Sequence, residues 1–78
     1  MNIVTLYNKL LKNGYEAKKV NLLSKDGKER LGIMVKHDYN GPYPTKDALD
    51  IHTAVASIAR RAGFNADKRG YCTATLIY

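Results

Sequence analysis

The dipeptide Asp26-Gly27 lies between two segments that have the residue pattern of β-strands, and it constrains the fold more than any other feature of the chain. An Asp-Gly pair is typical of two-residue hairpin loops, in which both central residues take positive φ. A two-residue loop at this position pairs Leu22 with Leu31 and fixes the register of every other pair. The sequence therefore predicts a β-hairpin over residues 15–38.

The predicted register sorts the side chains of the hairpin, because they alternate between the two faces of a strand. One face is apolar and holds Val20, Leu22, Leu31, Ile33 and Val35. The other face is basic and holds Lys19, Lys25, Lys28, Arg30 and Lys36. A shift by one residue would turn lysines toward the core, which disfavours other registers.

Two further segments show apolar residues at helical spacing. Residues 2–13 are expected to form a helix that begins after an N-cap at Asn2 and ends before Gly14. A second helix is expected between Thr45, its predicted N-cap, and Gly63, with Phe64 packing back after the stop. The apolar stripe of this second helix consists of Ala48, Ile51, Val55, Ile58 and Ala62.

The last segment, residues 71–78, alternates like a strand, and we expect Cys72, Ala74 and Leu76 to face the core. Residues 64–67 are a candidate for one more short strand. The order is then α-β-β-α-(β)-β. We predict an α+β fold in which one antiparallel sheet of three or four strands carries both helices on one face. Residues 1–78 are expected to form a single compact domain, with the opposite sheet face left to water or a partner.

The net charge of +6 on 78 residues, from 13 basic and 7 acidic side chains, is unevenly distributed. Residues 1–36 carry eight basic and three acidic groups, whereas residues 37–58 carry one basic and three acidic groups. Such a basic surface with a nearby aromatic ring is suited to phosphates and unpaired bases. The predicted nucleic-acid contacts are Lys19, Lys25, Lys28, Arg30, Lys36, Arg60, Arg61, Lys68, Arg69 and Tyr71. The competing interpretations are lysines that protect sheet edges and arginines that complement a helix dipole.

The segment Tyr39–Thr45 is a loop in which Tyr39 and Tyr43 stand among glycine and proline. Tyrosine is enriched where proteins contact partners, so both are candidate partner-binding residues. This supports a rival function, a small protein-interaction module such as an inhibitor or adaptor, of a size that suggests a phage or mobile element. Such a module would dock an acidic protein through the loop or a sheet edge, and an edge also offers a route to a homodimer.

Catalytic and metal-binding patterns are weak in this sequence. It has no nucleophile motif, phosphate loop or paired-carboxylate signature. Two histidines each have an acid nearby in sequence, His37 beside Asp38 and His52 near Asp50. Each pair is at most an isolated base with an orienting acid. We therefore predict a non-catalytic protein with no metal and no cofactor.

Cys72, the single cysteine, allows no intramolecular disulfide and suits a reducing compartment. No apolar run approaches the roughly 18–20 residues of a membrane span, and residues 1–7 do not resemble a signal peptide. We therefore expect a cytoplasmic protein that does not contact a membrane.

Overall fold

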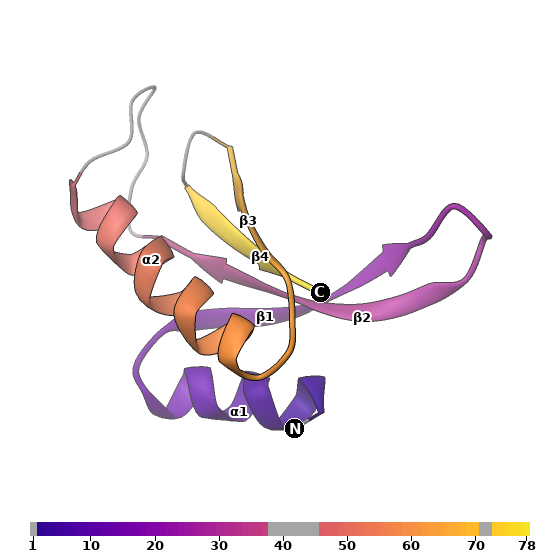
Figure 1. The fold of residues 1–78 in the computed structure, drawn as a ribbon, viewed down its shortest axis with the longest axis horizontal. Helices are drawn as coiled ribbons and strands as arrows, with labels where there is room; N and C mark the ends of the chain where they lie inside the picture. The colour runs from indigo at the N-terminus through magenta and orange to yellow at the C-terminus, as the bar shows by residue number, and fades with distance from the viewer. Residues whose placement is uncertain (1, 38–45, 71–72) are drawn as a thin grey trace.

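The computed structural model describes residues 2–37, 46–70 and 73–78. The elements in chain order are α1 (Ile3–Lys12), β1 (Glu16–Leu23), β2 (Glu29–Lys36), α2 (Lys46–Arg61), β3 (Ala66–Arg69) and β4 (Ala74–Ile77). The four strands form one antiparallel sheet in the order β1-β2-β4-β3 (Figure 1). The predicted α+β fold and its order of elements are confirmed, and the optional short strand is present.

The helices begin and end close to the predicted positions. The side chain of Asn2 caps α1 by accepting a hydrogen bond from the backbone N–H of Thr5, at 2.8 Å. After α2, Gly63 has a φ of 90°, a left-handed conformation that glycine adopts without strain. The chain then turns back, so that the Phe64 N–H donates to the Ala59 carbonyl at 3.0 Å and the Phe64 ring packs against the core. The predicted N-cap of α2, Thr45, lies outside the described residues.

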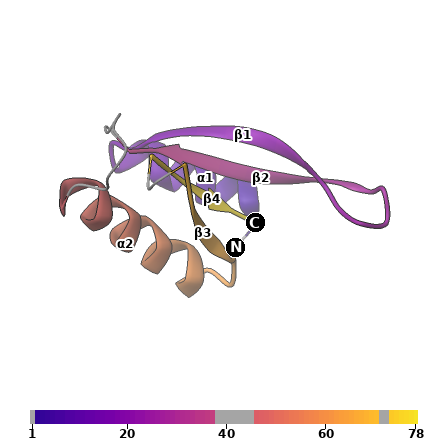
Figure 2. The same ribbon diagram turned by 90° about the horizontal axis from the view of Figure 1, so that it is seen from above.

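Both helices contribute to one hydrophobic core on a single face of the sheet, as predicted. In Figure 2 the long β1–β2 ribbon runs along one side of the molecule and α2 along the other. The buried members of the core are Leu6, Leu10, Ile33, Val35, Val55, Ala56, Ala59, Ala66 and Ile77. Because this cluster draws on both helices, we call this side of the sheet the helix-covered face and the opposite side the uncovered face.

The hairpin register differs by one residue from the prediction. Asn21, not Leu22, pairs with Leu31. The loop has three residues, Lys25 to Gly27, and is closed by a hydrogen bond of 2.9 Å from the Ser24 N–H to the Lys28 carbonyl. Gly27 has a φ of 79°, as expected for the left-handed residue that ends a three-residue hairpin loop. The prediction of a two-residue turn is therefore wrong.

The side chain of Asp26 explains why the longer loop is stable. Its carboxylate accepts hydrogen bonds from the Ser24 hydroxyl and from the backbone N–H of Lys28. These two bonds, the first being the larger effect, hold the pKa of Asp26 below its usual value. An Asp-Gly pair thus supports this loop as well as the shorter one, because the carboxylate bonds the backbone two residues on.

The changed register inverts the two faces of β1. On β2, Leu31, Ile33 and Val35 face the helices as predicted. On β1, Val20 and Leu22 point to the uncovered face instead.

Lys19 belongs to the helix-covered face, not to the predicted basic face, and Lys18 takes its place on the uncovered face. The Lys19 Nζ lies 5.5 Å from the centroid of the Tyr7 ring of α1, within range of a cation–π contact. Burial of lysine is avoided because β1 is an edge strand, so Lys19 stays exposed beside the helix.

The faces of β4 are also opposite to the prediction. Thr75 and Ile77 face the helices, whereas Ala74 and Leu76 face away. The reason is that Ile77 pairs with Ile33 on one side and with Ala66 on the other, which places it in the centre of the core. Cys72, expected in the core, lies outside the described residues.

Candidate nucleic-acid interface

The uncovered face has an apolar centre with cations around it. The centre consists of the half-buried Val20, Leu22 and Met34, together with Leu76, which is only 6% exposed and so is buried as the sequence predicted, although on this face. The cations on the same face are Lys18, Arg30, Lys36 and Arg69, and the acids are Glu16 and Asp67. Leu22 lies over Gly32, where no side chain intervenes. Cations therefore outnumber acids on a surface that neither helix covers.

Tyr78 adds an aromatic ring to this face. It continues the line of β4 and exchanges backbone hydrogen bonds with Asn65, at 2.8 and 3.1 Å. The Arg30 guanidinium carbon lies 5.5 Å from the ring centroid. The Tyr78 hydroxyl donates to the Asp67 carboxylate at 2.6 Å, and this bond is the main reason that the pKa of Tyr78 is raised. The predicted aromatic residue, Tyr71, lies outside the described residues.

A shallow hollow of about 200 Å³ lies between the hairpin and the end of β4. Its lining residues are Leu22, Leu23, Ser24, Arg30, Arg69, Leu76 and Tyr78. The hollow combines apolar side chains, one aromatic ring and two guanidinium groups. This chemistry suits a flat, unpaired base beside a phosphate.

The structure separates the predicted contact residues into two groups. Arg30, Lys36 and Arg69 lie on the uncovered face, and Lys25 and Lys28 are exposed at the hairpin loop next to it. Arg60, Arg61 and Lys68 lie with α2 on the other side of the sheet. The loop residues Tyr39 and Tyr43, predicted to bind a partner, are outside the described residues.

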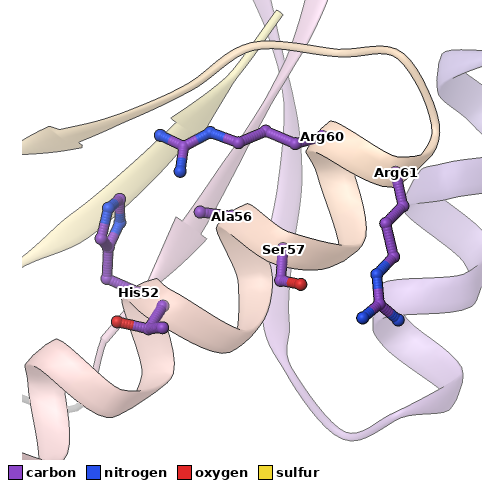
Figure 3. Close-up of a pocket in the computed structure, with 6 residues that line it drawn as sticks. His52, Ala56, Ser57, Arg60 and Arg61 are labelled. Carbon is purple, nitrogen blue, oxygen red and sulfur yellow. The ribbon is translucent and has the colours of Figure 1, made fainter.

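Arg60 and Arg61 of this second group line an open groove along α2, shown in Figure 3, whereas Lys68 is not among its lining residues. The groove has a volume of about 630 Å³ and is lined by His52, Thr53, Ala56, Ser57, Arg60 and Arg61. The Arg60 guanidinium turns toward the sheet, where its Nη2 donates to the Ala66 carbonyl at 3.1 Å. Arg61 points away from His52 and Arg60 in the same view. Arg60 is thus held in place, with its remaining donors available.

Two histidines distant in sequence meet at one threonine. The Thr75 Oγ1 lies 2.6 Å from the His37 Nε2 and 2.8 Å from the His52 Nδ1. The hydroxyl has a single proton, so it donates to one ring and accepts from the other. His37 and Thr75 are fully buried and His52 is half-buried. The sequence had associated His52 with Asp50 and His37 with Asp38, and Asp38 lies outside the described residues. The structure joins the two rings through the Thr75 hydroxyl.

Burial and nearby positive charge act together on His52. Its pKa is lowered first by burial, then by His37, whose ring centroid is 6.0 Å away, and then by Lys68 and Arg60. Asp67 opposes this shift. The neutral imidazole is therefore the favoured form in the free protein.

Neither metal ligation nor a membrane span emerges from the part of the chain that the structure describes. No group of three or more His, Cys, Asp or Glu side chains is placed there to hold a metal ion. Neither helix within the described residues has the length and hydropathy to cross a bilayer. Comparison with protein-family models, curated proteins and solved structures finds no match to this chain.

Proposed function

We propose that this protein is a small, basic, non-catalytic binding protein that contacts the phosphate backbone of nucleic acid through the uncovered face, in the cytoplasm. The observation that supports it most is the set of four cations around an apolar centre with Tyr78, on a sheet face left free by both helices. The single cysteine supports the location.

The apolar centre favours single-stranded nucleic acid over a duplex. Cations bind phosphates of any sequence and of either strand number. Apolar and aromatic side chains gain contact only when a base is unpaired and turned toward the protein. The uncovered face offers both kinds of group within one sheet, so little sequence specificity is expected.

Adjacent lysines on opposite faces give a matched test. Lys18→Glu reverses a charge on the uncovered face, and Lys19→Glu makes the same change on the helix-covered face. Binding of a labelled single-stranded oligonucleotide is measured by fluorescence anisotropy across a salt series. We expect Lys18→Glu and Arg30→Glu to weaken binding several-fold more than Lys19→Glu, because only the former lose a phosphate contact.

The salt dependence provides a second check. With four phosphate contacts, the slope for single strands is about −0.7 for each contact, so affinity falls roughly fifty-fold between about 50 and 200 mM salt. No binding at low salt, or a flat salt response, would refute the proposal. Equal effects of Lys18→Glu and Lys19→Glu would refute the assignment to the uncovered face.

A second candidate function is protein–protein interaction through the edge strand β1. It is favoured by Leu23, an apolar side chain that is 74% exposed at the end of this strand. An exposed strand edge accepts another strand through backbone hydrogen bonds. Light scattering tests whether the added strand comes from a second copy. In that case the wild type is a dimer and Leu23→Asp is a monomer.

A further inference from the structure

His52 has one ring nitrogen held inside the protein and one open to the groove. Its Nδ1 bonds to the buried Thr75 hydroxyl. Its Nε2 forms no hydrogen bond within the part of the chain described. No buried side-chain nitrogen or oxygen among these residues is left without a partner, so this Nε2 is accessible to solvent. The ring is therefore held in place through its Nδ1, and its Nε2 can bind a ligand.

Two cations accompany His52 from different elements. Arg60 comes from the same helix, two turns further on, and is anchored by its bond to the Ala66 carbonyl. Lys68 comes from β3 and points to the helix-covered face. After burial, which has the largest effect, both cations and the buried His37 lower the pKa of His52. The carboxylate of Asp67 raises this pKa. Cations from a helix and an adjacent strand thus converge on one accessible imidazole.

The edge strand β3 connects this cluster with the uncovered face. Successive side chains of β3 alternate, so Lys68 points to the helix-covered face and Arg69 to the uncovered face. No further strand pairs with the outer edge of β3 among the described residues. A nucleic-acid strand on the uncovered face that crosses this edge passes from Arg69 to Lys68 and then reaches His52.

We propose that His52, Arg60 and Lys68 form a second phosphate-binding site for the same nucleic acid, and that His52 takes up a proton when a phosphodiester binds there. This inference rests on the proposed function. It adds a site on the other side of the sheet and a dependence on pH that the uncovered face alone does not have.

The physical reason is charge compensation. In the free protein burial of the ring opposes protonation of His52 most, and the neighbouring cations oppose it further. A phosphodiester carries a negative charge, which cancels this repulsion and accepts a hydrogen bond from the protonated Nε2. The protonated ring also has a hydrogen on Nδ1, so Thr75 accepts from His52 and directs its own proton to the His37 Nε2. The buried hydroxyl therefore accommodates the charged ring without losing a hydrogen bond.

Binding of an oligothymidylate at several pH values tests this site. Thymine has no group that titrates between about pH 5.5 and about pH 8, so a pH dependence in this range comes from the protein. We expect wild-type affinity to rise about three- to tenfold from the upper to the lower pH at constant salt, a change equivalent to a pKa rise of up to about one unit. His52→Asn, which keeps a polar atom near Thr75, should show a much smaller rise.

Two controls separate the roles of the residues. Lys68→Gln should weaken binding more than Lys9→Gln, which removes the same charge from α1. Histidine ring nitrogen shifts in the wild type give the pKa of His52 directly, and this pKa should increase when the oligonucleotide saturates the protein. This measurement needs no variant and so does not depend on the folding of His52→Asn.

The outcomes distinguish this inference from the proposed function. Oligonucleotide binding with an unchanged pKa of His52, or the same pH dependence in His52→Asn as in the wild type, refutes the second site and leaves the uncovered face as the binding surface. No binding at any pH refutes both.

Discussion

Replacement of Thr75 by Val should destabilise the protein more than its small change in shape suggests. Valine has nearly the shape of threonine and lacks the hydroxyl. Thr75 is fully buried, and its hydroxyl is the partner of the His37 Nε2 at 2.6 Å. His37 is also fully buried, so no water replaces the lost bond at this atom. The Nδ1 of His52 is less affected because this side chain is only half-buried.

The expected size follows from the buried nitrogen. Leaving one buried polar atom without its partner costs about 1–3 kcal/mol. In a domain of 60–100 residues each kcal/mol lowers the Tm by about 4–8 °C. Thr75→Val should therefore unfold about 5–20 °C below the wild type, and thermal unfolding followed by circular dichroism near neutral pH measures this difference.

Thr75→Ser is the matched control, since it keeps the hydroxyl and loses one methyl group, which is worth about 1 kcal/mol. If the hydroxyl matters as described, Thr75→Ser retains more stability than Thr75→Val in urea unfolding. The reasoning is refuted if Thr75→Val unfolds at the wild-type temperature, or if Thr75→Ser is the less stable of the two.

Three further predictions concern stability. Asn2→Ala removes the cap of α1 and should lower the free energy of unfolding by about 1 kcal/mol, with Asn2→Ser close to the wild type in urea titrations. Gly32→Ala places a Cβ 2.7 Å from the Leu22 Cδ1 and 2.9 Å from the Ile77 carbonyl oxygen, which should lower the free energy of unfolding by about 1–3 kcal/mol; thermal unfolding that matches the wild type would contradict this packing. Because the folded protein lowers the pKa of His52, the unfolded chain binds the proton more readily. The free energy of unfolding should therefore decrease as the pH falls below 6.5, the ordinary pKa of histidine. Urea titrations of wild type and His52→Asn should show a smaller decline in the variant.

The elements were predictable from the sequence because their signals are local. The cap at Asn2, the stop at Gly63 and the spacing of apolar residues in α2 act within a few residues. The register of the hairpin was not predictable in this way, because Asp26-Gly27 fits two loop lengths. Hydrogen bonds from Ser24 and Lys28 to the Asp26 carboxylate stabilise the longer loop.

The shifted register does not bury the lysines of β1, contrary to the prediction. The reason is that neither face of the hairpin is covered along its whole length. In the structure β1 is an edge strand, so Lys19 lies on the helix-covered face and still reaches solvent beside Tyr7. The position of a strand within the sheet is a long-range property that turn residues do not report.

The candidate site was predictable only in part. Arg30 and Lys36 lie on the uncovered face because β2 has its predicted alternation. Arg69 lies there too, but it was expected in a turn after the short strand, whereas it is the last residue of β3. Tyr78 was not predicted as part of the site. Strand alternation puts Tyr78 on the same face as Leu76, but this face could be identified only once Ile77 was known to face the core. The meeting of His37 and His52 at Thr75 depends on strand order, which no local pattern contains.

The unequal lengths of the strands have a consequence for motion. β1 and β2 pair over eight residues each, but β4 pairs with β2 only from Ile33 to Lys36. The outer half of the hairpin therefore projects as a two-stranded ribbon beyond the four-stranded part, on the right of Figure 1. Two-stranded ribbons are only marginally stable by themselves, so backbone amides there should exchange hydrogen with solvent through local opening, faster than those next to β4.

This ribbon carries half of the uncovered face. Leu22 and Arg30 lie on it, whereas Lys36 and Arg69 belong to the four-stranded part. In the free protein the contact between Arg30 and Tyr78 links the two halves. A ligand that contacts both the ribbon and the four-stranded part would restrain the ribbon. Slower amide hydrogen exchange in the outer hairpin would then indicate that this ligand has bound.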